Sequence, residues 1–147
     1  MQKDFDKWNN QKKLINNLEN LFYHEREVWW CHLGINVGFE QDGKGKNFLR
    51  PILIIKGFSK NVLLCVPLTT KLKEGKYYSQ IILSGGLPRM VILSQIKMID
   101  SKRLREKICM ISEDQFKIIK QKKPIVKITV GFILIKKFFF PDLIQKI

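Results

Sequence analysis

Residues 51–68, PILIIKGFSKNVLLCVPL, contain two short apolar runs separated by a turn, and this stretch decides the fold class. The runs are Pro51 to Ile55 and Val62 to Leu68, and the residues Gly57 to Asn61 connect them. Runs of this length that are rich in β-branched residues and bounded by turn residues are typical of strands. The centre of the chain is therefore expected to be β structure.

The same pattern continues on both sides of this stretch. Further apolar runs lie at residues 28–33, 77–83 and 90–99. The other connections, which contain turn residues, are 43–47, 71–76 and 84–88. No helix of about 10–15 residues separates these runs, which argues against a parallel, doubly wound α/β fold. Such spacing is typical of a small, strongly curved sheet or barrel.

Amphipathic helices are predicted at both ends of this β region. From Asp4 to about Phe22 apolar residues recur at helical spacing, and Asp4 can cap the first turn. Trp8 in this helix is interpreted as a core residue. Ser112-Glu113-Asp114-Gln115 fits a capping box, in which Gln115 would reach back to the Ser112 backbone. A short helix should follow, to about Lys122.

Length and composition indicate one globular domain with an anionic partner. The chain has 147 residues, of which 45% are hydrophobic, so it can form a core. Its net charge is +14, and residues 1–30 hold five basic and five acidic side chains, so the excess lies beyond residue 30. The first residues lack the pattern of a signal peptide, and the run at 125–140 is too short and charged to span a bilayer. A cytoplasmic protein without a membrane partner is expected.

The cysteines and histidines do not predict a metal centre. Cys31, Cys65 and Cys109 are widely spaced in apolar surroundings, which favours buried, reduced thiols. His24 and His32 are not at metal-ligand spacing from each other or from a cysteine. We expect no metal and no cofactor, and we interpret His32 as a satisfied, half-buried imidazole.

Five segments in order resemble the MazF/PemK family of toxin endoribonucleases. They are EVWWCHLG (27–34), GFEQDG (38–43), RPILI (50–54), VPLTTK (66–71) and ILSQIKMID (92–100). The resemblance implies a mostly β, SH3-like, partly open barrel over residues 27–121. An amphipathic helix at residues 1–26 would be added before it, a short helix would close it, and residues 122–147 would form an atypical tail. All would belong to one domain.

The resemblance also implies a function. It implies a toxin of a type II toxin–antitoxin system that is a homodimer and is inhibited by an acidic antitoxin protein. The activity would be metal-independent, sequence-selective cleavage of single-stranded RNA. The 2′-OH of the substrate would act as nucleophile and leave a 2′,3′-cyclic phosphate.

Site residues follow from the same motifs. Arg50 and Thr69 match the family's catalytic residues: a guanidinium can stabilise charge on the phosphate, and a hydroxyl can hold a nonbridging oxygen. Supporting roles are expected for Glu40, which could orient Arg50, and for Thr70 and Ser94. The lysines expected to contact RNA phosphates are Lys44, Lys46, Lys71 and Lys97. Gly38 and Gly43 are expected to have positive φ in the loop over the site.

Some features leave alternatives open. Phe39 and Ser94 stand where some family members carry a histidine or an acid, so a general base is absent at these two positions, although Glu40 could accept a proton. Tyr77, Tyr78 and Phe48 could stack on bases, although aromatic strand residues are more often core. The alternatives to an RNase are a non-enzymatic, CcdB-like toxin that poisons a protein target, or a catalytically degenerate RNA-binding module.

Overall fold

Two long central strands, β2 (Leu49–Gly57) and β3 (Val62–Thr69), carry the stretch that predicts the sheet. A computed structural model describes residues 3–122 of the chain. The two strands pair antiparallel, with Ile52 opposite Pro67. Alternate side chains point to opposite faces, and both faces are covered: Leu53 and Ile55 enter one apolar cluster, whereas Ile52 and Ile54 enter another. This double burial explains the unbroken apolar runs of the sequence.

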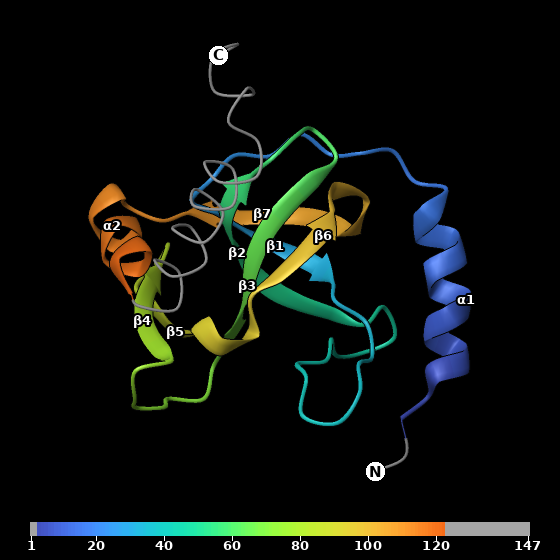
Figure 1. Cartoon of the computed structure of the whole chain (residues 1–147), viewed down its shortest axis with the longest axis horizontal. Helices are drawn as coiled ribbons and strands as arrows, with labels where there is room; N and C mark the ends of the chain where they lie inside the picture. Colours follow the sequence, from blue (N-terminus) through green and yellow to red (C-terminus); the bar gives the residue numbers. More distant parts are fainter. Residues whose placement is uncertain (1–2, 123–147) are drawn as a thin grey trace, which may run out of the picture.

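The sheet curls into a partly open barrel around these strands (Figure 1). Its strand order is β4-β5-β3-β2-β1-β7, and β6 pairs with the other end of β3. The remaining strands are β1 (Glu27–His32), β4 (Tyr78–Leu83), β5 (Leu87–Ile92), β6 (Lys97–Asp100) and β7 (Leu104–Met110). Helices α1 (Phe5–Asn16) and α2 (Glu113–Gln121) lie on opposite sides of the barrel (Figure 1). The expected mostly β, partly open barrel with a helix at each end is confirmed.

The first helix is shorter than its apolar spacing predicted. Asp4 caps it as expected, through a bond from the Lys7 amide to its side chain, but the helix ends at Asn16. Leu18 and Phe22 lie beyond it and are exposed. The Asn20 side chain donates to Asp100 Oδ1 and Ser101 Oγ, which holds the chain along the barrel after the helix ends. Trp8 is buried, as predicted.

The run at residues 90–99 is not one strand. β5 ends at Ile92, a 3₁₀ turn occupies Leu93–Gln95, and β6 begins at Lys97. The break has a topological reason: β5 pairs with the end of β3 near Thr69, whereas β6 pairs with its beginning at Val62–Cys65. One straight strand could not reach both places.

β7 was not anticipated, because three consecutive charged residues, 105–107, interrupt its apolar pattern. All three are exposed on this edge strand, which pairs with β1. The buried inward-facing positions Leu104 and Cys109 anchor it to the core.

The predicted capping box at α2 forms only in part. Ser112 Oγ accepts a hydrogen bond from the Gln115 amide, as expected. The Gln115 side chain, however, does not return to Ser112: its Oε1 accepts from the Ile82 amide at 2.6 Å and its Nε2 donates to the Ile82 carbonyl at 3.2 Å. Tertiary contact with β4 therefore replaces the local bond. The predicted tail lies almost entirely outside the described residues, which end at Lys122.

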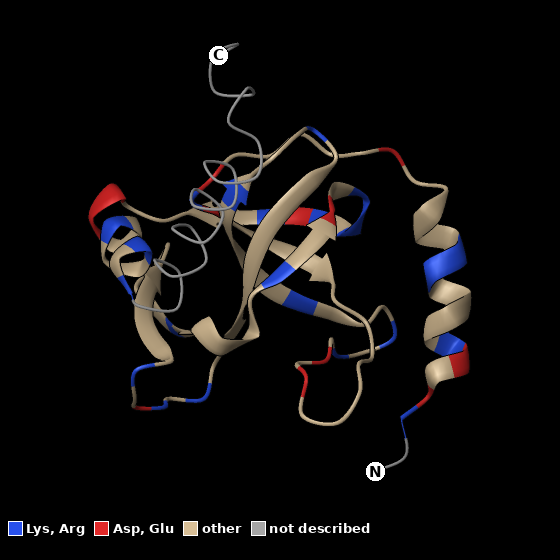
Figure 2. Cartoon of the chain, in the orientation of Figure 1, with Lys and Arg blue, Asp and Glu red and all other residues tan. Residues whose placement is uncertain are grey.

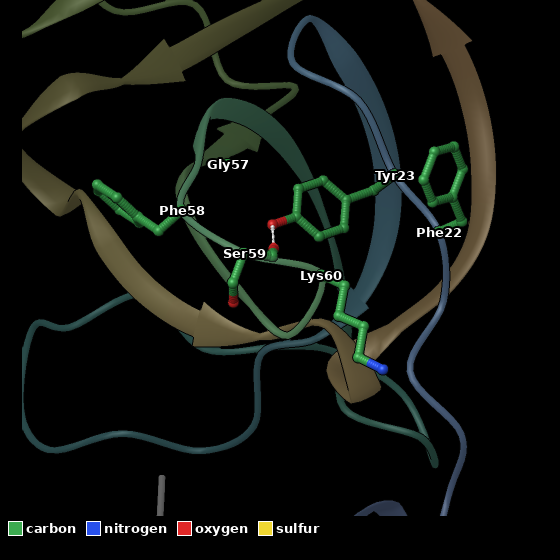
Figure 3. A pocket seen from close by; sticks show the side chains of 6 residues that line it. All are labelled: Phe22, Tyr23, Gly57, Phe58, Ser59 and Lys60. Carbon is green, nitrogen blue, oxygen red and sulfur yellow. Dashed lines mark hydrogen bonds between the residues drawn. The ribbon is translucent and has the colours of Figure 1, made fainter. Parts of the chain in front are cut away.

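The connection before β1 packs against the β2–β3 turn and leaves a hollow of about 340 Å³ (Figure 3). Tyr23 stands over this turn, and its hydroxyl donates to the carbonyls of Ser59 and Val62. Phe22 and Lys60 complete one side of the lining. Because the Tyr23 hydroxyl is hydrogen-bonded to the backbone, we infer that this contact stabilises the β2–β3 turn.

Glu27 is a buried carboxylate on β1, and only 2% of the residue is exposed. It accepts hydrogen bonds from Trp29 Nε1 at 2.8 Å, Lys107 Nζ at 2.7 Å and the His24 amide at 2.9 Å. Burial by itself raises the pKa of Glu27, but these bonds, led by that of Lys107, lower it more, and the net shift is downward. The carboxylate thus joins β1 to β7 and to the preceding segment.

His32 is buried at the end of β1, and its imidazole is neutral in the folded state. Its Nδ1 must donate to the Asn47 carbonyl, 2.8 Å away, because a carbonyl only accepts. Burial lowers the pKa of His32 from its usual 6.5, and the positive charges of Arg105 and Arg103 lower it further. The hydrogen bond to Asn47 acts in the opposite direction and raises it. The expected satisfied imidazole is confirmed, although only 3% of the residue is exposed.

Acidification should therefore weaken the fold. The unfolded state takes up a proton at His32 near its usual pKa, whereas the folded state resists it, so stability present above that pKa is lost as pH falls. We therefore expect the unfolding free energy to fall as the pH decreases from about 7.5 to about 5.5. Urea unfolding would measure it. His32→Asn, which offers a similarly placed donor but does not titrate, should lose less; an equal loss would contradict the assignment.

Candidate RNA-cleavage site

A small cleft of about 180 Å³ lies where the ends of β2 and β3 meet two loops. It brings together Arg50 from β2 and Thr69 from β3. The other lining residues come mainly from the β1–β2 and β3–β4 loops: Gln41, Lys44, Thr70, Lys71, Lys73 and Ile92. Because Ile52 is opposite Pro67, Arg50 and Thr69 lie at the same end of the paired strands. Strand register therefore joins two residues that are distant in the sequence.

Arg50 is held in place by backbone carbonyls. Its Nε donates to the carbonyl of Asp42 in the β1–β2 loop, and its Nη1 donates to that of Leu68 at 3.1 Å. A guanidinium has five N–H groups. Among residues 3–122, these two are the acceptors of Arg50, so three N–H groups remain for another acceptor.

The charge of Arg50 is not neutralised by an ion pair within residues 3–122. The nearby Asp42 carboxylate pairs instead with Lys3 at 2.8 Å. Burial lowers the pKa of Arg50 from its usual value, and the charge of Asp42 opposes this shift, but a guanidinium remains protonated. A partly buried cation with unused donors is a site for an anion.

Thr69 supplies a hydroxyl at the same cleft. Its Oγ1 accepts a hydrogen bond from the Lys71 amide at 3.2 Å, which leaves the hydroxyl proton available as a donor. Lys44, Lys71 and Lys73 add three more cations around it. The loop that joins β3 to β4 is rich in basic residues (Figure 2). The cleft is therefore suited to a phosphate group and its neighbours on a nucleic-acid strand.

Several expected residues lie outside the cleft. Glu40 does not contact Arg50; its carboxylate lies 3.8 Å from Lys97 Nζ, so each partly neutralises the other. Ser94 is exposed in the 3₁₀ turn after β5, and Lys46 is exposed in the β1–β2 loop. The cleft contains the other members of the predicted set: Arg50, Thr69, Thr70, Lys44 and Lys71.

The glycines of the β1–β2 loop serve two different purposes. Gly38 has a φ of 55°, as predicted. Gly43 does not have a positive φ, and that prediction is wrong; a Cβ at this position would collide with the Phe48 carbonyl oxygen. Two of the aromatic residues considered for base stacking differ in exposure. Phe48 is buried in the core, whereas Tyr77 is 44% exposed, and Lys76 Nζ lies 5.0 Å from the centroid of the Tyr77 ring.

Three contributors to the site were missed by sequence reasoning. Lys73 lines the cleft, and the basic composition of residues 71–76 could have indicated it. The Gln95 side chain stabilises the β1–β2 loop: its Oε1 accepts from the Gln41 amide at 3.3 Å, and its Nε2 donates to the Phe39 carbonyl at 3.4 Å. Asp42 holds Arg50 through its backbone carbonyl, an interaction for which sequence patterns offer no signal.

Comparison with known families decides the membership of the chain. Residues 24–124 match the model of the PemK-like, MazF-like toxins of type II toxin–antitoxin systems. The chain belongs to this toxin family. The resemblance seen in the sequence motifs is thereby confirmed. A comparison with curated protein sequences gives no significant match.

Solved structures agree on the fold of this MazF-like toxin. The structure of MazF from Deinococcus radiodurans is 18% identical, with a TM-score of 0.58 over 70% of this chain and 94% of that one. An endoribonuclease from a mycobacterial species is 14% identical, with a TM-score of 0.51 over 76% of this chain and 92% of that one. A MazE–MazF structure from Deinococcus radiodurans is 15% identical, with a TM-score of 0.53 over 70% of this chain and 92% of that one.

Neither described helix has the length and apolarity that a bilayer crossing requires.

Proposed function

We propose that this MazF-like toxin is a metal-independent endoribonuclease that cleaves single-stranded RNA at selected sequences. The observation that carries the proposal is the state of Arg50: it is partly buried, has no ion-pair partner among residues 3–122, and has three unused N–H donors in a cleft with Thr69 and three lysines. A phosphodiester fits this chemistry. The related mycobacterial structure described as an endoribonuclease supports the same activity.

In the proposed reaction, the 2′-hydroxyl loses its proton to water as its oxygen attacks the adjacent phosphorus. The bond to the 5′-oxygen of the next nucleotide breaks, and that oxygen takes a proton from water. The products are a 2′,3′-cyclic phosphate and a 5′-hydroxyl. Arg50 stabilises the negative charge that develops on the nonbridging oxygens, and Thr69 donates to one of them, which fixes the phosphate for in-line attack. Thr70 and Lys71 lie beside it, and Lys44 and Lys73 bind neighbouring phosphates.

The described lining of the cleft contains no Asp, Glu or His. We therefore assign the rate enhancement to charge stabilisation and positioning, and assign no side chain as general base. Glu40, Ser94, Lys46 and Lys97 lie outside the cleft, and we give them at most contacts with RNA farther along the strand.

The same basic cleft fits the partner that we propose as inhibitor. An acidic antitoxin segment could place carboxylates on Arg50 and its lysines and exclude RNA. The MazE–MazF complex among the related structures supports an antitoxin partner. We also propose a cytoplasmic homodimer, from the family relationship.

The function is tested by incubating the purified protein with single-stranded RNA in EDTA and mapping new ends. Discrete cuts with 2′,3′-cyclic phosphate ends are expected. A matched RNA that carries 2′-O-methyl only at the mapped position should not be cut there, since its nucleophile is blocked. Cutting of the methylated RNA would contradict the mechanism, and RNA that is bound but intact would favour a non-catalytic RNA-binding module.

A further inference from the structure

The segment before β1 is fastened to the barrel at both ends of α1. Near its end, Lys102 Nζ donates to the Asn16 carbonyl at 2.9 Å, and Asn20 bonds Asp100 and Ser101. Near its beginning, Lys3 reaches the β1–β2 loop, which lies beside this end of the helix (Figure 1). Residues 3–23 precede the part of the chain, 24–124, that matches the family model.

The Lys3 ammonium uses its full donor capacity on that loop. It donates to the carbonyls of Asn36 at 2.6 Å and Gly38 at 3.0 Å, and pairs with Asp42 Oδ2 at 2.8 Å. An ammonium has three N–H donors, and these three acceptors match them. The side chain is only 27% exposed, so the ion pair is screened less than one on the open surface.

Asp42 connects this anchor to the cleft. Its Oδ2 pairs with Lys3, its Oδ1 accepts from the Asn36 amide at 2.6 Å, and its backbone carbonyl accepts from Arg50 Nε. The carboxylate therefore fixes the same residue whose carbonyl sets the orientation of the guanidinium. The Nη groups, which face the proposed phosphate, turn with Nε because the guanidinium is planar.

Trp8 supports the loop from the apolar side. It is 5% exposed and meets Phe48 edge to face, with ring centroids 5.4 Å apart. Its ring occupies the space where a Cβ on Gly34 would lie, and Arg103 stands 5.5 Å from its centroid. The beginning and the end of the β1–β2 loop are thus both packed against α1.

We propose that Lys3 is a positioning residue for the proposed RNA cleavage, and that it orients Arg50 through Asp42. The inference rests on the proposed function of Arg50. The inference predicts that Lys3, which does not line the cleft, affects the chemical step through the Asp42 carboxylate.

The test compares kinetic constants of Lys3→Ala with those of the wild type on the mapped RNA. We expect kcat to fall about 10-fold with little change in KM, because a displaced guanidinium still attracts RNA but stabilises the transition state poorly. Asp42→Ala should lose as much, and Lys3→Ala with Asp42→Ala should lose no more than either change alone. Lys3→Arg, which keeps charge and donors, should recover most of the rate.

Lys7→Ala is the matched control, since it removes the same charge from α1 at an exposed side chain without a bond to the loop. It should leave kcat unchanged. Equal kcat for wild type and Lys3→Ala, or additive losses in the double variant, would overturn the inference.

Hydrogen exchange separates this inference from the proposed function. The amides of Gly43 and Lys44 are bonded to the carbonyls of Gly34 and Leu49. They should exchange faster in Lys3→Ala than in Lys7→Ala, whether or not RNA is cut. If the wild type cuts no RNA, the proposed function fails, and unchanged exchange would then also reject the anchoring role of Lys3. Similar melting temperatures of the two variants would show that both fold.

Discussion

Arg50→Ala should lower kcat for RNA cleavage by about 10²–10³-fold, the effect of removing a main donor to the oxygens that gain charge. Three of its N–H groups have no acceptor among residues 3–122, and Arg50 lines the same cleft as Thr69. Alanine removes them together with the positive charge. Single-turnover cleavage of the mapped RNA would measure the loss without contribution from product release.

Two further variants make the Arg50 result specific. Arg50→Lys keeps the charge but not the planar fork, and should recover only part of the rate. Arg105→Ala removes an exposed arginine of β7 that does not line the cleft, and should retain the wild-type rate. If Arg105→Ala loses as much as Arg50→Ala, general attraction between the basic protein and RNA explains the effect, and Arg50 is not catalytic.

Glu27→Ala should be the most destabilising of the changes considered, at about 2–4 kcal/mol of unfolding free energy. It leaves the Trp29 indole N–H and the His24 amide without their acceptor and deprives Lys107 of its counter-ion. Lys107 is 46% exposed at its side chain, so water relieves part of the loss. Urea unfolding at neutral pH would measure the change.

Glu113→Ala provides the comparison for Glu27. Glu113 pairs with Arg26 at 3.1 Å, but its side chain is 69% exposed, and its loss should cost about 0–1 kcal/mol. Glu27→Gln, which keeps one acceptor oxygen, should fall between the two. Equal stability of Glu27→Ala and Glu113→Ala would show that the buried carboxylate does not join β1 to β7 as described.

The strands β1 to β4 were predictable from their apolar runs, whereas β7 and the break between β5 and β6 were not. Both faces of β2 and β3 pack in apolar clusters, so nearly all their residues are apolar. Such continuous runs can be recognised in the sequence. β7 is an edge strand of the described sheet, and three consecutive exposed charged residues, 105–107, leave it without an alternating apolar pattern. The end of α1 depends on Asn20 bonding to β6 and the turn after it, a tertiary contact that helical spacing does not encode.

The site divides in a similar way. Arg50, Thr69, Thr70, Lys44 and Lys71, which line the cleft, were predicted from the sequence, because the roles proposed for them belong to their side chains. Asp42 contributes through a backbone carbonyl, and Lys3 through a contact across the fold, so neither leaves a local pattern. Glu40 was expected from the GFEQDG motif to orient Arg50, but its carboxylate lies 3.8 Å from Lys97 Nζ.

The contact between Gln115 and Ile82 also bears on self-association. Within residues 3–122, β4 is the last strand on its side of the sheet, and Ile82 is 43% exposed there. An unpaired strand edge can template the addition of a strand from another molecule. Gln115 already bonds both the amide and the carbonyl of Ile82, so these two groups near the end of β4 are not available to an incoming strand. The Gln115 side chain thereby occupies one pair of the backbone groups through which this edge could pair with another molecule.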